Sequence, residues 1–265
     1  MSTSLKPSSF GTRVRWWRAR RGWSQLDLAA QAAVSQRHLS FLESDRTKPS
    51  REMVLRLSGA LGVPLRQQNS LLLAAGYAPH WDEGPLGEGE HVRIERGIGF
   101  MLMQQEPFPA FVVDRRWNLL KGNRGAGRLV GLLTGSATMA PNKINLADAL
   151  VAPDGLRPHI VNWEEVVLQF VRSVQADAAV DGNRDTSDLL RRLLSYPDVS
   201  MLAQARWQDA SPEPVLNIHF CKDGISLQMF TMIATLGTPQ SVTAQEIRVE
   251  MFFPANGGTE AFFRG

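Results

Sequence analysis

The chain has 265 residues, of which 43% are hydrophobic and 21% are charged. This length is long for one domain and typical of two. The single cysteine, Cys221, precludes an internal disulfide, and no apolar run is long enough to cross a bilayer. The first residues also lack the apolar core of a signal peptide. We therefore expect a cytoplasmic protein with no membrane partner.

Charge is divided unevenly along the chain. Residues 1–80 hold 12 Lys and Arg against 4 Asp and Glu, a balance of +8. The other 185 residues hold 17 against 22, a balance of −5, which the net charge of +3 conceals. A basic first part and a mildly acidic remainder predict that one part alone contacts nucleic acid.

A basic, tryptophan-bearing segment from Phe10 is followed by the run WSQLDLAAQAAVS at residues 23–35. This run predicts a helix with a defined start, because Ser24 and, three residues later, Asp27 form the pattern of a capping box. The buried side of this helix is expected to hold Leu26, Leu28 and Ala29. A tight turn at residues 32–34 is expected to end it.

A second short helix is expected after Ser35, whose hydroxyl can cap it. With Val34, Leu39 and Leu42 turned inward, four residues at its N-terminal end face outward: Ser35, Gln36, Arg37 and Ser40. Glutamine can bond adenine, and arginine can bond guanine through two hydrogen bonds. The two helices are therefore predicted to form a helix-turn-helix that reads double-stranded DNA, with these four residues as base contacts.

Phosphate contacts are expected around this reading edge. Gln25 begins the first helix of the pair, where its amide and the backbone N–H groups can meet a phosphate. Arg46, Lys48 and Arg51 follow the second helix and can fix its register on DNA. A basic cluster alone would be as readily a solvated surface, but this one flanks a helix-turn-helix.

Residues 10–63 resemble the helix-turn-helix domain of phage Cro and cI repressors, the XRE-like family, in the order and spacing of these features. The resemblance implies about five helices, with Gln25 as a phosphate contact and Ser35, Gln36 and Arg37 as base contacts. It also implies a structural ion pair between Arg18 and Glu43.

Two residues depart from the XRE-like pattern. Ala33, in the turn, and Asp45, after the second helix, stand where the family usually has glycine. Ala33 is tolerated if the turn does not demand a positive φ. Aspartate is among the better non-glycine residues for a left-handed position, so neither residue removes the resemblance.

A further helix is predicted at residues 64–75, ended by Gly76 and Pro79. A segment at 81–90 then collects Gly, Pro and acidic residues without periodicity. We therefore expect a helix-turn-helix domain at residues 8–78, a linker at 79–91 and a second domain at 92–265.

The second domain is predicted to be α+β. Helical spacing of apolar residues marks residues 92–104, and strands at 110–113 and 117–120 form a hairpin. Asn123 can cap the next helix. Two amphipathic helices (163–179 and 186–196) precede three candidate strands (215–220, 225–236 and 247–253). Five strands with helices inserted between the second and third predict a largely antiparallel five-stranded sheet.

Three strings resemble the MmyB-like regulators: REMVLRL at 51–57, LLLAAGYAP at 71–79 and FVVDRRWN at 111–118. In that family an XRE-type helix-turn-helix precedes a PAS-like ligand-binding domain, and the resemblance covers nearly the whole chain. A fatty acid has been associated with this domain class. The resemblance therefore implies a fatty acid or another small apolar effector, with no cofactor.

Seven residues are candidates for lining an apolar ligand pocket between sheet and helices: Phe111, Trp117, Trp163, Phe170, Met229, Ile233 and Phe252. Each could instead be a plain core residue, which is the more common fate of such side chains. A carboxylate ligand would also need a cationic partner, and the candidates are Arg116, Arg124 and Arg128.

The expected function is regulation without catalysis, because the five histidines are scattered and no catalytic motif is present. We expect a homodimer on a palindromic operator with half-sites about one helical turn apart. An effector that favours one arrangement of the dimer would change operator affinity. Two alternatives stay open: a second domain that is a ligand-free dimerisation or protein-docking module, and one that is a degenerate or active enzyme.

Overall fold

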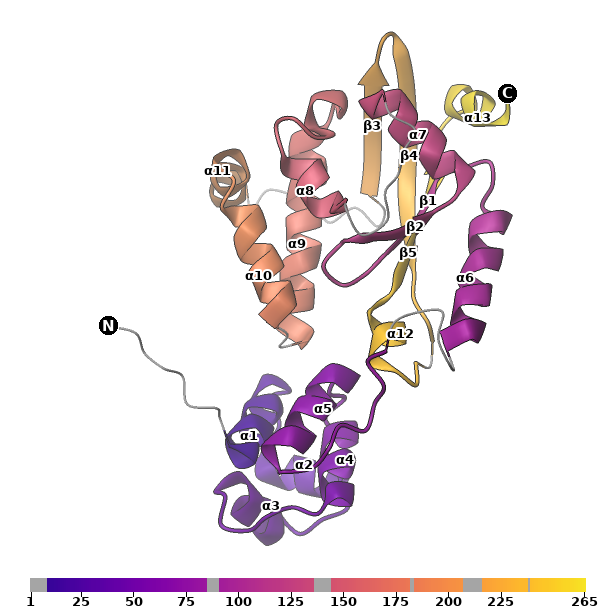
Figure 1. The fold of residues 1–265 in the computed structure, drawn as a ribbon. Helices are drawn as coiled ribbons and strands as arrows, with labels where there is room; N and C mark the ends of the chain where they lie inside the picture. The colour runs from indigo at the N-terminus through magenta and orange to yellow at the C-terminus, as the bar shows by residue number, and fades with distance from the viewer. Residues whose placement is uncertain (1–8, 85–90, 136–143, 182–183, 207–215, 238) are drawn as a thin grey trace. The chain divides into compact units, whose positions relative to one another are not determined.

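The structure, a computed structural model, describes residues 9–84, 91–135, 144–181, 184–206, 216–237 and 239–265 (Figure 1). The chain divides into two compact units. Met1–Glu83 with Gln240–Val242 form the first, and Gly84–Pro239 with Thr243–Gly265 form the second.

The first unit contains the predicted five-helix domain: α1 (Phe10–Arg20), α2 (Gln25–Gln31), α3 (Gln36–Glu43), α4 (Arg51–Ala60) and α5 (Leu65–Ala74). Four of these helices begin after a serine whose side chain accepts a hydrogen bond from the backbone N–H three residues on: Ser9, Ser24, Ser35 and Ser50. At α2 the Asp27 side chain accepts from the N–H of Ser24, so the predicted capping box is present.

The core of the first unit is formed by apolar side chains from all five helices. The fully buried ones are Val14, Leu28, Leu39, Leu42, Val54, Leu57 and Leu72. The prediction that Leu26 is buried is wrong, because this side chain is 61% exposed. Each helical residue turns through roughly 100°, so Leu26 lies nearly opposite Leu28. The buried stripe of α2 continues instead through Ala29 to Ala32.

The turn between α2 and α3 does demand a positive φ. Ala33 has φ 53° there, a conformation that costs a residue with a side chain about 1–2 kcal/mol. Asp45 is also left-handed, with φ 54°, but its carboxylate accepts a hydrogen bond from the N–H of Gly11 at 3.0 Å and another from the hydroxyl of Ser9. Asp45 thus offsets its strain by joining the end of α3 to the start of α1, which an alanine cannot do.

His80 and Trp81, predicted to lie in the linker at 79–91, belong to the first unit and bond to Asn69 of α5. The side-chain oxygen of Asn69 accepts from the backbone N–H groups of His80 and Trp81 at 2.9 and 3.0 Å. Its amide nitrogen donates to the carbonyl of Trp81 at 2.8 Å. Residues 85–90 of the expected linker lie outside the described residues, and the domain boundaries stay a prediction.

The second unit is built on a sheet of five strands: β1 (Ala110–Val113), β2 (Leu119–Gly122), β3 (Leu216–Lys222), β4 (Ile225–Ala234) and β5 (Arg248–Pro254). The order across the sheet is β2-β1-β5-β4-β3, and every neighbouring pair is antiparallel. The last strand in sequence is therefore the central one. The predicted α+β domain with an antiparallel five-stranded sheet is confirmed.

Helices lie on both sides of this sheet (Figure 1). On one side α6 (Val92–Gln104) packs against β1 and β5. The larger core, on the other side, includes residues of α7 (Arg124–Thr134), α8 (Leu146–Val151), α9 (Trp163–Asp181), α10 (Arg184–Leu194) and α11 (Pro197–Arg206). A short 3-10 helix, η2 (Arg157–His159), precedes α9, while α12 (Val242–Glu246) and α13 (Gly257–Arg264) flank β5. Strand side chains alternate between the two cores.

The first hairpin differs from the prediction at Trp117. This residue was expected to begin the second strand, but β2 begins at Leu119 and Trp117 has φ 65°. The Asp114 carboxylate accepts the backbone N–H of Arg116 at 2.8 Å, which tightens the turn. The Trp117 ring enters the larger core, where its centroid lies 4.7 Å from that of Phe170 in an edge-to-face contact.

Candidate DNA-reading surface and ligand cavity

Helix α3 has a buried side and an exposed side. Leu39 and Leu42 are fully buried against the other helices. The four predicted base readers lie together at the N-terminal end of the outer side, three of them exposed and the last partly buried: Ser35, Gln36, Arg37 and Ser40. The helix thus presents hydrogen-bonding side chains to solvent without using them in the core. Their contact with bases stays a prediction.

Phe41 belongs to the same surface and was missed by sequence reasoning. The guanidinium carbons of Arg37 and Arg46 lie 5.5 and 6.0 Å from its ring centroid. Cation–π contacts of this kind hold flexible arginines near a ring face. The spacing of Arg37 and Phe41, four residues apart on one helix, was the available signal.

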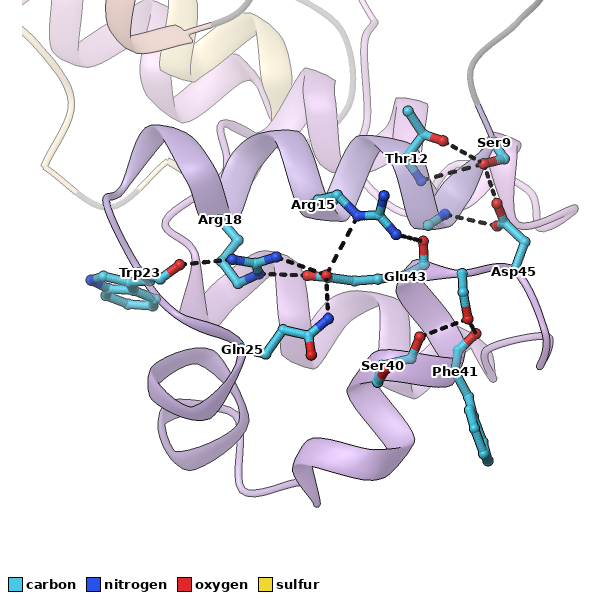
Figure 2. A network of polar contacts seen from close by, with 12 residues as sticks. Ser9, Thr12, Arg15, Arg18, Trp23, Gln25, Ser40, Phe41, Glu43 and Asp45 are labelled. Carbon is cyan, nitrogen blue, oxygen red and sulfur yellow. Dashed lines mark hydrogen bonds and ion pairs between the residues drawn. The ribbon is translucent and has the colours of Figure 1, made fainter.

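Glu43, the last residue of α3, holds three helices together (Figure 2). Arg18 of α1 donates from Nε to Oε1 at 2.6 Å and from Nη2 to Oε2 at 2.8 Å. Gln25 of α2 donates its amide to Oε2 at 2.9 Å, and Arg15 donates to the backbone carbonyl of Glu43 at 2.9 Å. The expected pair of Arg18 and Glu43 is therefore present, with two further donors around it.

The Glu43 carboxylate stays ionised although its side chain has no exposed area. Burial alone would raise the pKa of Glu43. Hydrogen bonds from Arg18 and Gln25, together with the charges of Arg18 and Arg15, outweigh burial, and the pKa lies below its ordinary value. The hydrogen bond to Glu43 in turn raises the pKa of Arg18. The pair therefore fixes α3 against α1 as a charged unit at neutral pH.

The four predicted phosphate contacts occupy two kinds of environment. Gln25 is partly buried, and its side-chain nitrogen is already bonded to the carboxylate of α3. Arg46, Lys48 and Arg51 are exposed in the segment that joins α3 to α4 and at the start of α4. The structure therefore places three basic side chains just after the proposed reading helix. Whether each meets a phosphate stays a prediction.

A cavity of about 80 Å³ lies within the second unit. Its described lining consists of Phe111, Trp117, Leu129, Val130, Leu133, Leu146, Leu150, Leu156, Ile160, Val166, Phe170, Ile218, Phe220, Glu250 and Phe252. Four of the seven predicted pocket residues are among them, namely Phe111, Trp117, Phe170 and Phe252. Trp163 and Met229 do not line the cavity but are buried in the core around it.

The prediction that Ile233 lines the pocket is corrected by the structure. Its side chain is 45% exposed, and it is absent from the described lining. Thr231 of β4 pairs with the first residue of β3. Ile233 is two residues further along β4, so it lies beyond the end of β3. The alternation of a strand gives the face on which a residue lies, but not whether it reaches a cavity along that face.

Glu250 lines the cavity and was missed in the sequence. It lies on the central strand β5, opposite Phe111 of β1, and is 8% exposed. Burial raises the pKa of Glu250 to about 7, against the opposing effects of a hydrogen bond from Thr231 and the charge of Arg248. Its position two residues before Phe252 placed it on the pocket face, but glutamate is rarely buried, so the pattern favoured solvent.

The three arginines considered as partners for a carboxylate ligand lie elsewhere. Arg116 forms an ion pair with Asp185 at 2.5 Å. Arg128 donates to the carbonyl of Phe263 at 3.1 Å, and Arg124 is exposed at the start of α7. None of the three belongs to the described lining of the cavity.

Neither a membrane-spanning helix nor a cluster of metal-binding side chains occurs among the described residues. No helix among them has the length and apolar character of a membrane span. Within the same residues, His, Cys, Asp and Glu do not gather in a group of three or more that could hold a metal ion. Cys221 is a free, exposed thiol on β3.

A capped helix pair with a polar outer face is followed by an α+β unit with an internal cavity, and the family matches of these two parts define a class: proteins in which a helix-turn-helix domain precedes a transcription regulator ligand binding domain. Residues 14–68 match the helix-turn-helix family. Residues 94–264 match the family described as the MmyB-like transcription regulator ligand binding domain. The second match covers more than half of the chain, and the protein belongs to this family.

Individual relatives share a smaller part of the chain. Uncharacterised HTH-type transcriptional regulators of Mycobacterium bovis and of two strains of Mycobacterium tuberculosis are 40% identical to it over 71 residues. The alignment covers 27% of this chain and 28% of each relative. The similarity therefore concerns about a quarter of each protein.

Proposed function

We propose that the protein reads a specific DNA operator with the outer face of α3, and that a small apolar ligand in the cavity changes its affinity for that operator. The observation that carries the first part is the division of α3. Two leucines of this helix are fully buried, while the polar residues at its N-terminal end face outward. A helix of this kind can enter the major groove without loss of core packing.

The proposed base contacts are Ser35, Gln36, Arg37 and Ser40. Glutamine can bond adenine, arginine can bond guanine through two hydrogen bonds, and a serine hydroxyl can serve either base. Phe41 supports this assignment, because its ring restrains Arg37 beside the reading face. The proposed phosphate contacts are Gln25, Arg46, Lys48 and Arg51, with Gln25 acting through the start of α2.

A regulator of this kind is proposed to bind as a homodimer. A two-fold dimer brings two copies of α3 to half-sites about one helical turn apart, so its operator is palindromic. A ligand that binds one arrangement of the dimer more tightly shifts the spacing of the two reading helices. The chain would then act through binding and not through catalysis, in the cytoplasm.

The test of DNA reading is selection from a random DNA library followed by affinity measurements with single variants. Gln36→Ala or Arg37→Ala should cost about 1–3 kcal/mol on the selected sequence and little on random DNA. Arg56→Ala is a matched control, because Arg56 is exposed on α4 and pairs with Glu52. An equal loss on selected and random DNA would remove Gln36 and Arg37 from the base contacts.

The test of ligand binding is native mass spectrometry of the purified protein, with extraction and identification of what is released. An apolar molecule at a fixed ratio to the chain would support the sensor function, and a fatty acid is one class to seek. Its addition should then change affinity for the selected operator. If adding the released molecule left operator affinity unchanged, this result would contradict its role as effector.

A second candidate function follows from the size of the cavity. Ligand pockets commonly enclose about 300–1,000 Å³, and the cavity is about 80 Å³. A second unit that binds no ligand would serve as a dimerisation or protein-docking module. A ligand-free dimer whose melting temperature is unchanged across a panel of apolar molecules would favour this alternative.

A further inference from the structure

We propose, on the basis of the ligand site proposed above, that Glu250 selects the head group of the ligand. The favoured ligand is then an apolar chain that ends in an uncharged hydrogen-bond donor such as a hydroxyl. A free carboxylate is disfavoured. This inference concerns the chemistry of the ligand, while the function above concerns whether one binds.

The composition of the cavity wall is the first support. Apart from Glu250, the described lining consists of aliphatic and aromatic side chains from the sheet and the helices around it. A ligand in such a cavity is held mainly through apolar contact, and its orientation is set by the few polar groups available. Glu250 supplies such a group on the central strand, where it pairs with Phe111 of β1 and lies two residues before Phe252.

The surroundings of Glu250 are the second support. The groups that act on its carboxyl are Thr231 of β4, through a hydrogen bond, and Arg248 two residues earlier on β5. Arg248 is itself paired with Asp177 of α9 at 2.5 Å. β1 contributes Phe111 to the wall and α9 contributes Phe170. Glu250 is therefore a buried carboxyl, and the cation that acts on it, Arg248, is also paired with Asp177.

The chemical consequence depends on the sign of the charge. When Glu250 is ionised, a carboxylate ligand would bring a second negative charge to the same buried site, and like charges that share such a site oppose each other strongly. None of the three candidate arginines belongs to the described lining, so they do not neutralise that pair. A hydroxyl, in contrast, can donate to the Glu250 carboxylate without adding charge.

The experiment compares three ligands of equal chain length on the lipid-stripped, full-length protein: 1-octanol, octanoate and octyl methyl ether. Isothermal titration calorimetry at pH 8 gives their affinities for the unaltered protein and for Glu250→Gln. We expect octanol to bind about tenfold tighter than either of the others. In Glu250→Gln, octanoate should bind more tightly than it does to the unaltered protein. The ratio of octanol affinity to octanoate affinity should then approach one.

Glu246→Gln is the matched control. Glu246 pairs with Arg115 at 3.5 Å and does not belong to the described lining, so its replacement should leave the three affinities unchanged. A second measurement uses the unaltered protein alone. Lowering the pH from 8 to 6 should tighten octanoate binding, since Glu250 takes up a proton while octanoate stays ionised. This readout does not depend on the folding of any variant.

Each outcome decides a different point. Octanoate binding as tightly as octanol, or a ratio that Glu250→Gln leaves unchanged, would overturn the role of Glu250 while leaving the ligand site in place. The absence of binding by all three ligands, with nothing released on extraction, would overturn the ligand site as well.

Discussion

Arg18 and Glu43 meet through two hydrogen bonds, of 2.6 and 2.8 Å, between the last turn of α1 and the last residue of α3. Arg18 also donates to the carbonyl of Trp23 at 2.8 Å. One guanidinium therefore fixes both the end of the proposed reading helix and the segment before α2. Bidentate pairs of this kind fix orientation as well as distance. The angle at which α3 is presented thus depends on a contact remote from its reading face.

Removal of Arg18 should destabilise the first unit strongly. Arg18→Ala leaves the fully buried Glu43 carboxylate without its main partner, and loss of one partner of a buried pair costs about 3–5 kcal/mol. Urea unfolding followed by tryptophan fluorescence measures the change. Arg56→Ala, which breaks the exposed pair with Glu52, should cost about 0.5 kcal/mol or less. Similar losses for the two variants would contradict the structural role of the Arg18 pair.

Ala33→Gly should stabilise the protein. The left-handed φ of 53° strains alanine, and glycine relieves that strain at some cost in unfolded-chain entropy, for a net gain of about 0.5–1 kcal/mol. Thermal unfolding measures the gain. The matched control is Ala30→Gly, an exposed helical position of α2, which should lose about 0.5–1 kcal/mol. If both glycines lowered stability, the turn would not be strained.

Lys48→Ala should weaken binding to selected and random DNA alike and should make the salt dependence shallower. A phosphate contact releases counterions, so its loss lowers the slope of log affinity against log salt by about 0.9. Fluorescence anisotropy across a salt series measures the slope. Lys121→Ala removes the same charge from β2 of the second unit, where Lys121 pairs with Glu95, and should leave the slope unchanged. An unaltered slope for Lys48→Ala would remove it from the phosphate contacts.

The stability of the second unit should fall as the pH rises from about 4.5 to about 7. Burial raises the pKa of Glu250 from 4.5 to about 7, so the folded chain holds a proton that the unfolded chain has lost. The stabilisation is complete below pH 4.5 and is lost as the pH passes the folded value, for a total of about 3 kcal/mol.

Glu250→Gln carries no such proton and should be more stable than the unaltered protein at pH 8. Urea unfolding between pH 4.5 and pH 8 measures the free energy of unfolding against pH for both proteins. Glu246→Gln is the control, and it should keep the pH dependence of the unaltered protein. Parallel curves for the unaltered protein and Glu250→Gln would show that Glu250 does not titrate in this range.

The sequence predicted those features that depend on local chemistry. Ser24, Ser35 and Asn123 each cap a helix where expected, because a cap needs one side chain and the backbone beside it. Short helices were missed although similar signals preceded them. Asn145 caps α8 and Asn256 caps α13, each accepting from the backbone N–H three residues on, yet neither helix was predicted.

Predictions failed where the outcome depends on distant parts of the chain. Leu26 and Ile233 are apolar and lie in regular elements, yet they are exposed, since burial depends on what covers that part of the element. Glu250 is buried because β5 is the central strand. The pattern of one strand does not give its place in the sheet. The positive φ of Ala33 likewise follows from how α2 and α3 must pack, not from alanine itself.

The division of α3 also bears on how such a protein can diverge. Leu39, Leu42 and Glu43 hold the helix in the domain, and the proposed readers Gln36 and Arg37 take no part in that core. Exposed substitutions away from caps and core usually change stability by about 0.5 kcal/mol or less. A duplicated copy of the gene could therefore acquire a new operator through changes at these two positions, without passing through an unstable intermediate.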